Sequence, residues 1–264
     1  MKPIGPWGTV PSFRVYRTRS VETLLTHGTE STMSLRTLAA AAALLLSVPS
    51  PSLGQNVAVD EGAFRLYVDG QRAGREEFSV RQVGSADQGR IILRGTVSLE
   101  LPGGRINLAP AAEAASGDLE VSAYQIKVSG SETTDIFVSL SGRRYLSRTV
   151  SARGEELREF RAGPGSVLLD DGVAHHHHLL TPFLDSSSPV SLSILTPRAQ
   201  SQVRATLSLI GREEVRVGQD LLQARHFRLD GGDSPRDIWF DDRGRILRVE
   251  IPSRGYVAER ESLD

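Results

Sequence analysis

Apolar and polar side chains alternate along much of the chain after residue 55. Between residues 90 and 101, the apolar members of this alternation are Ile91, Leu93, Val97, Leu99 and Leu101. The same period of two recurs in the segments 64–68, 203–209 and 247–251. A period of two is typical of a β-strand that buries one face and exposes the other. Because Asp-Gly and Gly-Gly turn signals separate the segments, the pattern predicts about a dozen short antiparallel strands.

No long helix is predicted to cover the apolar faces of these strands, because no stretch after residue 55 keeps a helical period of 3.6. Residues 173–184 are expected to form one short helix, and the Ala- and Gly-rich segment 109–117 is expected to be a loop. A dozen strands exceed the roughly ten that an open twisted sheet holds comfortably. We therefore predict an all-β fold, with one strongly curved antiparallel sheet (a half-barrel or clam) and at most one or two short helices. A two-sheet sandwich is the alternative.

The segment 33–54 has the order of a secretory signal peptide. Arg36 precedes an unbroken run of apolar and small residues from Leu38 to Val48, which is shorter than the roughly 20 residues that cross a bilayer. Small residues at Ser52 and Gly54 then offer a cleavage site. We interpret residues 1–32 as a disordered upstream extension from a misassigned start codon. Residues 55–264 are then predicted to be a single exported β domain, periplasmic or secreted.

The composition removes several classes of function. The chain of 264 residues contains no cysteine, which excludes disulfides, thiolate metal sites, a cysteine nucleophile and an amino-terminal lipid anchor. A net charge of −1 argues against nucleic-acid binding, and no later apolar run is long enough to span a membrane. The sequence contains no phosphate-binding glycine loop and no serine-hydrolase motif. We therefore expect no cofactor, favour a non-enzymatic protein, and expect a monomer.

Four consecutive histidines, His175 to His178, are the first candidates for chemistry. Imidazole is a good ligand for zinc, nickel or copper. Adjacent residues cannot aim four rings at one ion, so a metal-dependent envelope enzyme is kept as an alternative that uses His176 and His178 with Asp170. We predict instead that the run lies at the rim of the sheet, on a loop or helix start, without a metal or a catalytic role.

The hairpins near the two ends of the predicted domain resemble those of a known group. The segment 237–249 places a strand with a tryptophan before an Asp-x-Gly turn and a second apolar strand. It resembles the last hairpin of uncharacterised exported bacterial proteins, whose domains of unknown function are similar to the curved β-clam of lipoprotein carriers. The segments 66–74 and 167–171 resemble the same group. The resemblance implies a curved β fold and an exported location, and it brings no catalytic residues.

The uncovered apolar faces suggest a function. A sheet that has to curl onto itself is expected to leave its concave side incompletely filled. We predict that an apolar or amphiphilic small molecule or lipid binds there, in contact with Trp239, Leu93, Val97, Leu207 and Val249. A structural or partner-binding envelope module without a pocket is a further alternative.

Overall fold

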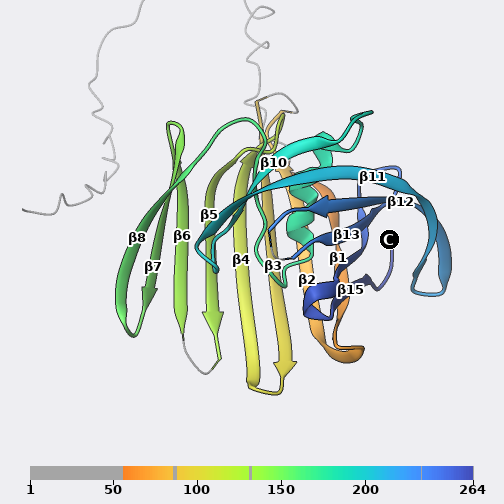
Figure 1. The fold of residues 1–264 in the computed structure, drawn as a ribbon, viewed down its shortest axis with the longest axis horizontal. Helices are drawn as coiled ribbons and strands as arrows, with labels where there is room; N and C mark the ends of the chain where they lie inside the picture. Colours follow the sequence, from red (N-terminus) through yellow and green to blue (C-terminus); the bar gives the residue numbers. More distant parts are fainter. Residues whose placement is uncertain (1–55, 86–87, 131–132, 233, 264) are drawn as a thin grey trace, which may run out of the picture. The chain divides into compact units, whose positions relative to one another are not determined.

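The computed structural model describes residues 56–85, 88–130, 133–232 and 234–263, in which the first eight strands form one arm of a sheet (Figure 1). Each strand of this arm pairs antiparallel with the next. The strands are β1 (Asn56–Val68), β2 (Gln71–Val83), β3 (Arg90–Leu101), β4 (Gly104–Ala115), β5 (Val121–Ser129), β6 (Thr134–Ser141), β7 (Arg144–Ser151) and β8 (Gly154–Arg161). The segments 1–32 and 33–54, interpreted above as an extension and a signal peptide, lie outside the described residues.

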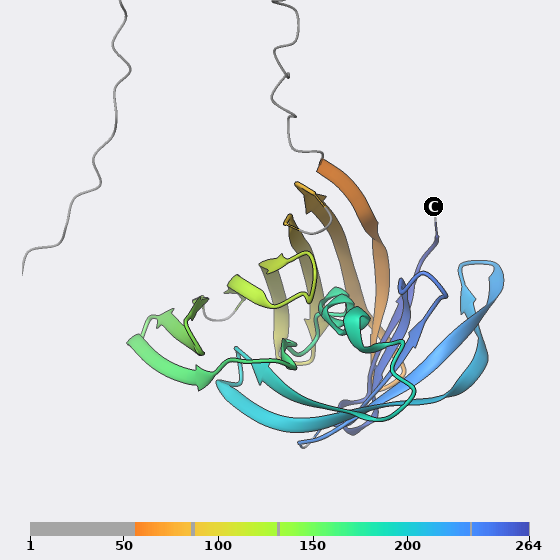
Figure 2. The same cartoon turned by 90° about the horizontal axis from the view of Figure 1, so that it is seen from above.

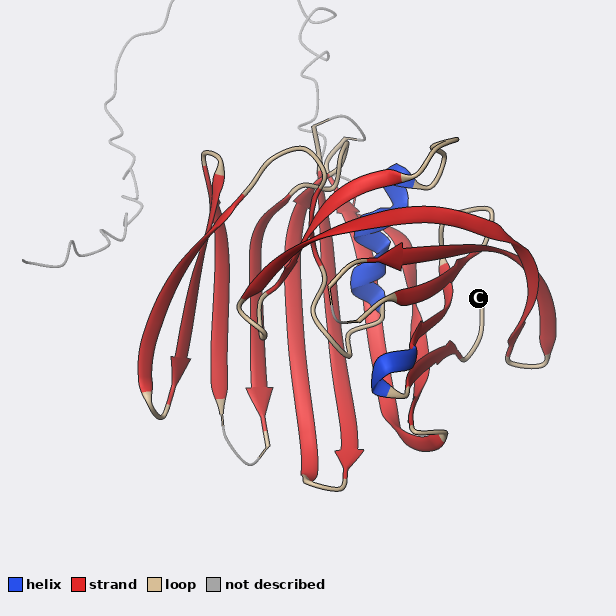
Figure 3. Ribbon diagram, viewed as in Figure 1, coloured by secondary structure: helices blue, strands red, loops and turns tan. Residues whose placement is uncertain are grey.

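The other seven strands form a second arm, which also carries two short 3-10 helices (Figure 3). The strand β9 pairs parallel with β10, and the other neighbours in this arm pair antiparallel. The elements are β9 (Ser166–Leu168), η1 (His175–Phe183), β10 (Val190–Thr196), β11 (Ser201–Val217), β12 (Asp220–Asp230), β13 (Arg236–Phe240), β14 (Ile246–Ile251), η2 (Pro252–Arg254) and β15 (Tyr256–Arg260).

The two arms belong to a single sheet because β1 pairs antiparallel with β15. The order across the sheet runs from β8 to β1 and then from β15 to β9. Seen from above, the two arms form walls on either side of η1, which lies on the concave side, and the ends of β8 and β11 come close to each other (Figure 2). The predicted all-β fold with one strongly curved sheet and at most two short helices is confirmed. No helix in the described part of the chain is long and apolar enough to cross a membrane.

The concave face of the sheet carries the main apolar core. The alternation predicted for 90–101 is confirmed, since the side chains of Ile91, Leu93, Val97 and Leu99 are buried in this core. Leu179 and Leu180 of η1 belong to the same cluster. The chain's own helix therefore occupies part of the concave side, which the sequence predicted to be incompletely filled.

The segment 109–117 is not the loop that its composition predicted. Its residues up to Ala115 belong to β4, where Ala112 and Ala114 point into the core. Alanine and glycine are weak strand formers, but β4 has a hydrogen-bonded neighbour on each side. Pairing and burial override a modest intrinsic preference of this kind.

A β-bulge changes the faces predicted for 247–251. The pairing of β13 with β14 shifts between Trp239↔Arg248 and Phe240↔Ile246, so that Leu247 is the extra residue. An inserted residue reverses the alternation beyond it. Ile246 consequently packs in the concave core with Val249, whereas Leu247 joins a second cluster on the other face.

Glutamine side chains link the two arms where the sheet does not close. The Arg161 N–H at the end of β8 donates to Gln202 Oε1 at 3.1 Å, and Gln202 Nε2 donates to the Arg161 carbonyl at 2.7 Å. Gln200 Nε2 also donates to Thr149 Oγ1 at 3.0 Å. One side-chain amide thus imitates the paired donor and acceptor of a neighbouring strand.

Candidate functional site

Glu76 of β2 fixes the beginning of η1 on the concave face. Its buried carboxylate accepts the backbone N–H groups of Ala174 and His175, each at 2.8 Å. The same carboxylate accepts a third hydrogen bond from His175 Nδ1 at 2.7 Å. The first amides of a helix have no partner within it, so a carboxylate at this position satisfies them.

Gly95 of β3 gives the His175 ring room to approach the sheet. A Cβ atom at this position would lie 2.5 Å from His175 Cε1. On the neighbouring strand, the Phe78 ring stacks on the His175 ring, with centroids 5.8 Å apart and an interplanar angle of 6°. The glycine is therefore needed for close approach of the ring, and β2 and β3 together form the seat of the helix.

The four histidines lie inside the fold, which corrects the prediction that they occupy the rim. They stand at a helix start, as expected, but their exposed fractions are 0%, 0%, 1% and 9% from His175 to His178. Burial lowers the pKa of His177 to about 3 and that of His178 to about 4, and it holds the pKa of His176 well below its usual range. These three rings are therefore neutral at pH 7.

Hydrogen bonds explain why polar rings are tolerated there. His176 Nδ1 accepts the backbone N–H of Asp170 at 3.2 Å, and His177 Nδ1 donates to the Ala174 carbonyl at 2.9 Å. The Asp170 carboxylate accepts a hydrogen bond from Tyr124 at 2.9 Å and lies 3.2 Å from Arg198 Nε. Burial raises the pKa of Asp170, and Arg198 opposes this effect. The network ties η1 to β5 and to the segment after β9.

The residues of the metal alternative are not gathered around one point. His176 contacts Asp170 through the Asp170 backbone N–H, which donates to His176 Nδ1 and so occupies the lone pair of that nitrogen. Among the residues that the structure describes, no three histidine or carboxylate side chains are grouped so that they could hold an ion. The Nε2 atoms of His175 and His176 are buried, and neither has a hydrogen-bond partner among the described residues.

A pocket of about 290 Å³ opens on the concave side between η2, the segment after β9 and the strands β10 to β13. One wall is apolar and consists of Ile194, Val203, Ala205 and Leu229. Ile194 and Leu229 are buried, whereas Val203 is 36% exposed. Pockets that bind small molecules have volumes of about 300 Å³ and more, so this pocket suits a small ligand.

The charged residues of the pocket, called its floor below, are Asp171, Arg236 and Arg254. One oxygen of the Asp171 carboxylate accepts a hydrogen bond from Arg236 Nη2 at 2.8 Å. The other oxygen forms an ion pair with Arg254 Nη1 at 2.7 Å. Arg236 is nearly buried, and burial lowers the pKa of its guanidinium while Asp171 opposes that shift. Arg254 is half-exposed, and its Nε donates to Ser234 Oγ at 3.0 Å.

The predicted ligand contacts fall into two places. Leu93, Val97, Leu207 and Val249 are all buried in the concave core. Trp239 belongs to the second cluster, with Val215, Val217, Ala224 and Leu247, and its ring stacks on His226 at 4.4 Å. Adjacent strand residues face opposite ways, and the neighbouring residue Ile238 is the one that faces the concave core.

The pocket residues were not found by sequence reasoning. Asp171 belongs to an Asp-Gly turn signal and stands next to the Asp170 of the metal alternative, and neither pattern indicates a pocket. Arg236 stands beside a proline at the beginning of a strand whose five residues are all buried. A buried arginine requires a carboxylate partner, so an arginine at the start of an apolar strand indicates a buried ion pair nearby.

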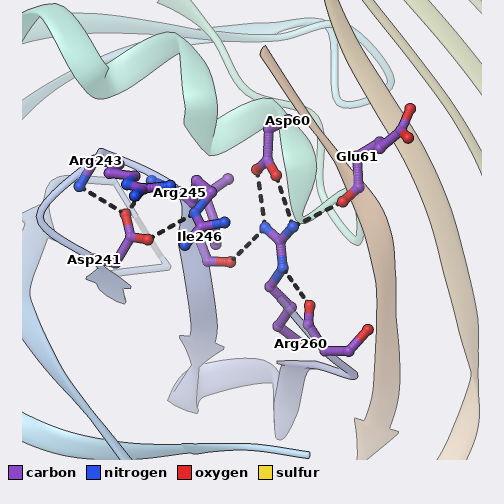
Figure 4. A network of polar contacts seen from close by, with 8 residues as sticks. Asp60, Glu61, Asp241, Arg243, Arg245, Ile246 and Arg260 are labelled. Atoms are coloured by element: carbon purple, nitrogen blue, oxygen red, sulfur yellow. Dashed lines mark hydrogen bonds and ion pairs between the residues drawn. The ribbon is translucent and has the colours of Figure 1, made fainter. Parts of the chain in front are cut away.

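A separate buried ion pair holds the β1–β15 junction together (Figure 4). Arg260 of β15 donates to both oxygens of Asp60 in β1, at 2.9 and 2.6 Å. Its remaining N–H groups reach the carbonyls of Glu61, Ile246 and Ser262. With every donor used internally, this pair is structural and offers nothing to a ligand.

No family model and no curated protein matches the sequence. Among solved structures, the fold is similar to the crystal structure of a β-barrel-like protein of the domain of unknown function DUF1849 from Brucella abortus. The sequence identity is 9% and the TM-score is 0.48, over 79% of this chain and 96% of that chain. The similarity assigns no ligand or activity.

Proposed function

We propose that the protein is a non-enzymatic module that binds a small amphiphilic molecule in the concave pocket between β10 and β13. The observation that carries the proposal is that apolar and charged side chains line one pocket on the concave face. An apolar wall stabilises a hydrocarbon segment by removing it from water, and polar groups fix its orientation.

The position of the histidines favours binding over catalysis. A metal-dependent or acid–base reaction requires a substrate to reach the imidazole rings. His175, His176 and His177 are at most 1% exposed, and their ring atoms serve the seat of η1. The pocket, in contrast, is lined in part by the partly exposed residues Val203 and Arg254.

Calorimetric titration with octanoate and with 1-octanol at pH 7 tests this proposal. Val203→Glu puts a carboxylate into the apolar wall of the pocket, and we expect it to abolish saturable binding of both probes. Leu209→Glu is the matched control, because Leu209 lies on the same strand, is 54% exposed and does not line the pocket. Binding that survives in the Val203 variant, or absence of binding by the native protein, would overturn the proposal.

We further propose that the protein is exported, on the strength of the signal-like segment 33–54. Amino-terminal sequencing of the protein purified from the envelope or medium is expected to give a start at Gln55 or within a few residues of it. A mature chain that retains Met1 or Met33 would contradict export by this signal.

A further inference from the structure

We propose that the ligand of this pocket carries a carboxylate or a similar single negative charge, which binds Arg254 and Arg236 beside Asp171. This inference rests on the proposed function and adds the chemical class of the ligand's polar end. It concerns the charged floor of the pocket alone, whereas the proposed function rests on the apolar wall and the charged floor together.

The charges on the floor do not balance. Among the described residues that line the pocket, the charged ones are Asp171, Arg236 and Arg254, which leaves one positive charge in excess. The nearby Asp170 already faces Arg198 at 3.2 Å. A guanidinium that is nearly buried, as Arg236 is, carries a desolvation cost that a further anion offsets. Arginine remains protonated in proteins, so the excess charge persists at neutral pH.

Hydrogen-bond donors are also left over. A guanidinium has five N–H groups, and Asp171 uses one nitrogen from each arginine. Arg236 Nη1 also lies 3.5 Å from His177 Nε2. Arg254 Nε is bound to Ser234, and the partners of Arg254 in the described part of the chain leave its Nη2 free. A second carboxylate can therefore join the floor without displacing Asp171. Charge-assisted hydrogen bonds of this kind are about twice as strong as neutral ones.

The volume limits the size of the ligand. A space of about 290 Å³ holds on the order of ten non-hydrogen atoms, at about 30 Å³ each for a water-sized unit. A medium-chain carboxylate such as octanoate has this size. Its carboxylate would lie at the arginines and its chain against Ile194, Val203 and Leu229.

Three probes of equal length separate the charge from the chain. Octanoate, octanamide and octylammonium are titrated against the full protein at pH 7 and low salt. We expect octanoate to bind about tenfold or more tighter than octanamide, and octylammonium to bind weakest. Equal affinities for octanoate and octanamide would overturn the anionic assignment and leave the proposed function standing. Failure of all three probes would remove both.

Two variants locate the effect. Arg254→Gln is expected to remove most of the preference for octanoate over octanamide. Arg212→Gln is the matched control, because Arg212 is similarly exposed and also pairs with an aspartate, Asp242 at 2.9 Å, outside the pocket. Asp171→Asn removes the competing charge and keeps an acceptor for Arg236, so octanoate is expected to bind about fivefold tighter. An unchanged preference in Arg254→Gln, or weaker octanoate binding by a folded Asp171→Asn variant, would contradict the proposal.

Discussion

The concave face has two unlike regions. One is the apolar face of strands β3 to β7, a sheet wall that is separate from the wall of the pocket, and the other is the polar seat of η1. The wall buries residues of one kind, among them Leu93, Leu108, Ile126 and Val138. The seat buries Glu76, four histidines and Asp170 among the same strands and their neighbours. Burial of apolar side chains is enough to stabilise this wall, because its backbone N–H and C=O groups are hydrogen-bonded to neighbouring strands. A helix that docks on the sheet brings unpaired amides and polar rings with it, and these require polar partners inside.

Acid should distinguish the two regions most strongly. The histidines at 176, 177 and 178 have folded-state pKa values below their usual range, about 3 for His177 and about 4 for His178. The unfolded chain therefore takes up protons near pH 6.5, and the folded protein does so only at much lower pH. The free energy of unfolding should fall as the pH falls from 6.5 to 5, by up to about 1.4 kcal/mol per pH unit for each ring.

Urea unfolding at pH 7.5, 6.5 and 5.5 measures this slope. Carboxylates with ordinary pKa values titrate below this window. The raised pKa of the Asp170 carboxyl gives a slope of the opposite sign, and we expect the three histidines to outweigh this one group. Replacing His178 with Gln, which cannot take up a proton, should reduce the slope. A stability that does not change between pH 7.5 and 5.5 would show that the seat is not a neutral, buried histidine cluster.

Removal of the Glu76 carboxylate should cost more than truncation in the wall. Glu76→Ala leaves three buried donors without a partner, and we expect a loss of about 4 kcal/mol in the free energy of unfolding. Leu93→Ala should cost about 3 kcal/mol through a cavity. Glu77→Ala, on the same strand with an exposed side chain, should change the free energy by less than about 0.5 kcal/mol. A Glu76 variant as stable as the Glu77 variant would refute the capping role.

The smallest expected effect comes from the boundary between the regions. Gly95→Ala forces the His175 ring away from β3, and we expect a loss of about 2 kcal/mol. The clash should disappear when His175 is also changed to Ala, so a double-mutant cycle should give a coupling of about 1 kcal/mol or more. Strict additivity of the two changes would mean that the ring does not pack on Gly95.

The difference between the regions also explains what the sequence predicts. Alternation identified the wall and the curved sheet, since both follow from a period of two. It missed the strand around Ala112, where small side chains hide the period, and the bulge at Leu247, which is a feature of pairing rather than of local sequence. For the candidate site, the ion pairs of Asp171 join residues 65 and 83 positions away. Contacts between residues so far apart in the sequence cannot be predicted from a local pattern of apolar and polar positions.

The pairing of β1 with β15 has a consequence for how the chain folds. Neighbouring strands within each arm are mostly close in sequence, so their hairpins can form locally. The Asp60–Arg260 pair instead joins residues 200 positions apart, and it is buried at that junction. Closing so long a loop costs entropy before any contact repays it. We therefore expect the two arms to form first and their junction last, which makes this ion pair a marker of the final step of folding.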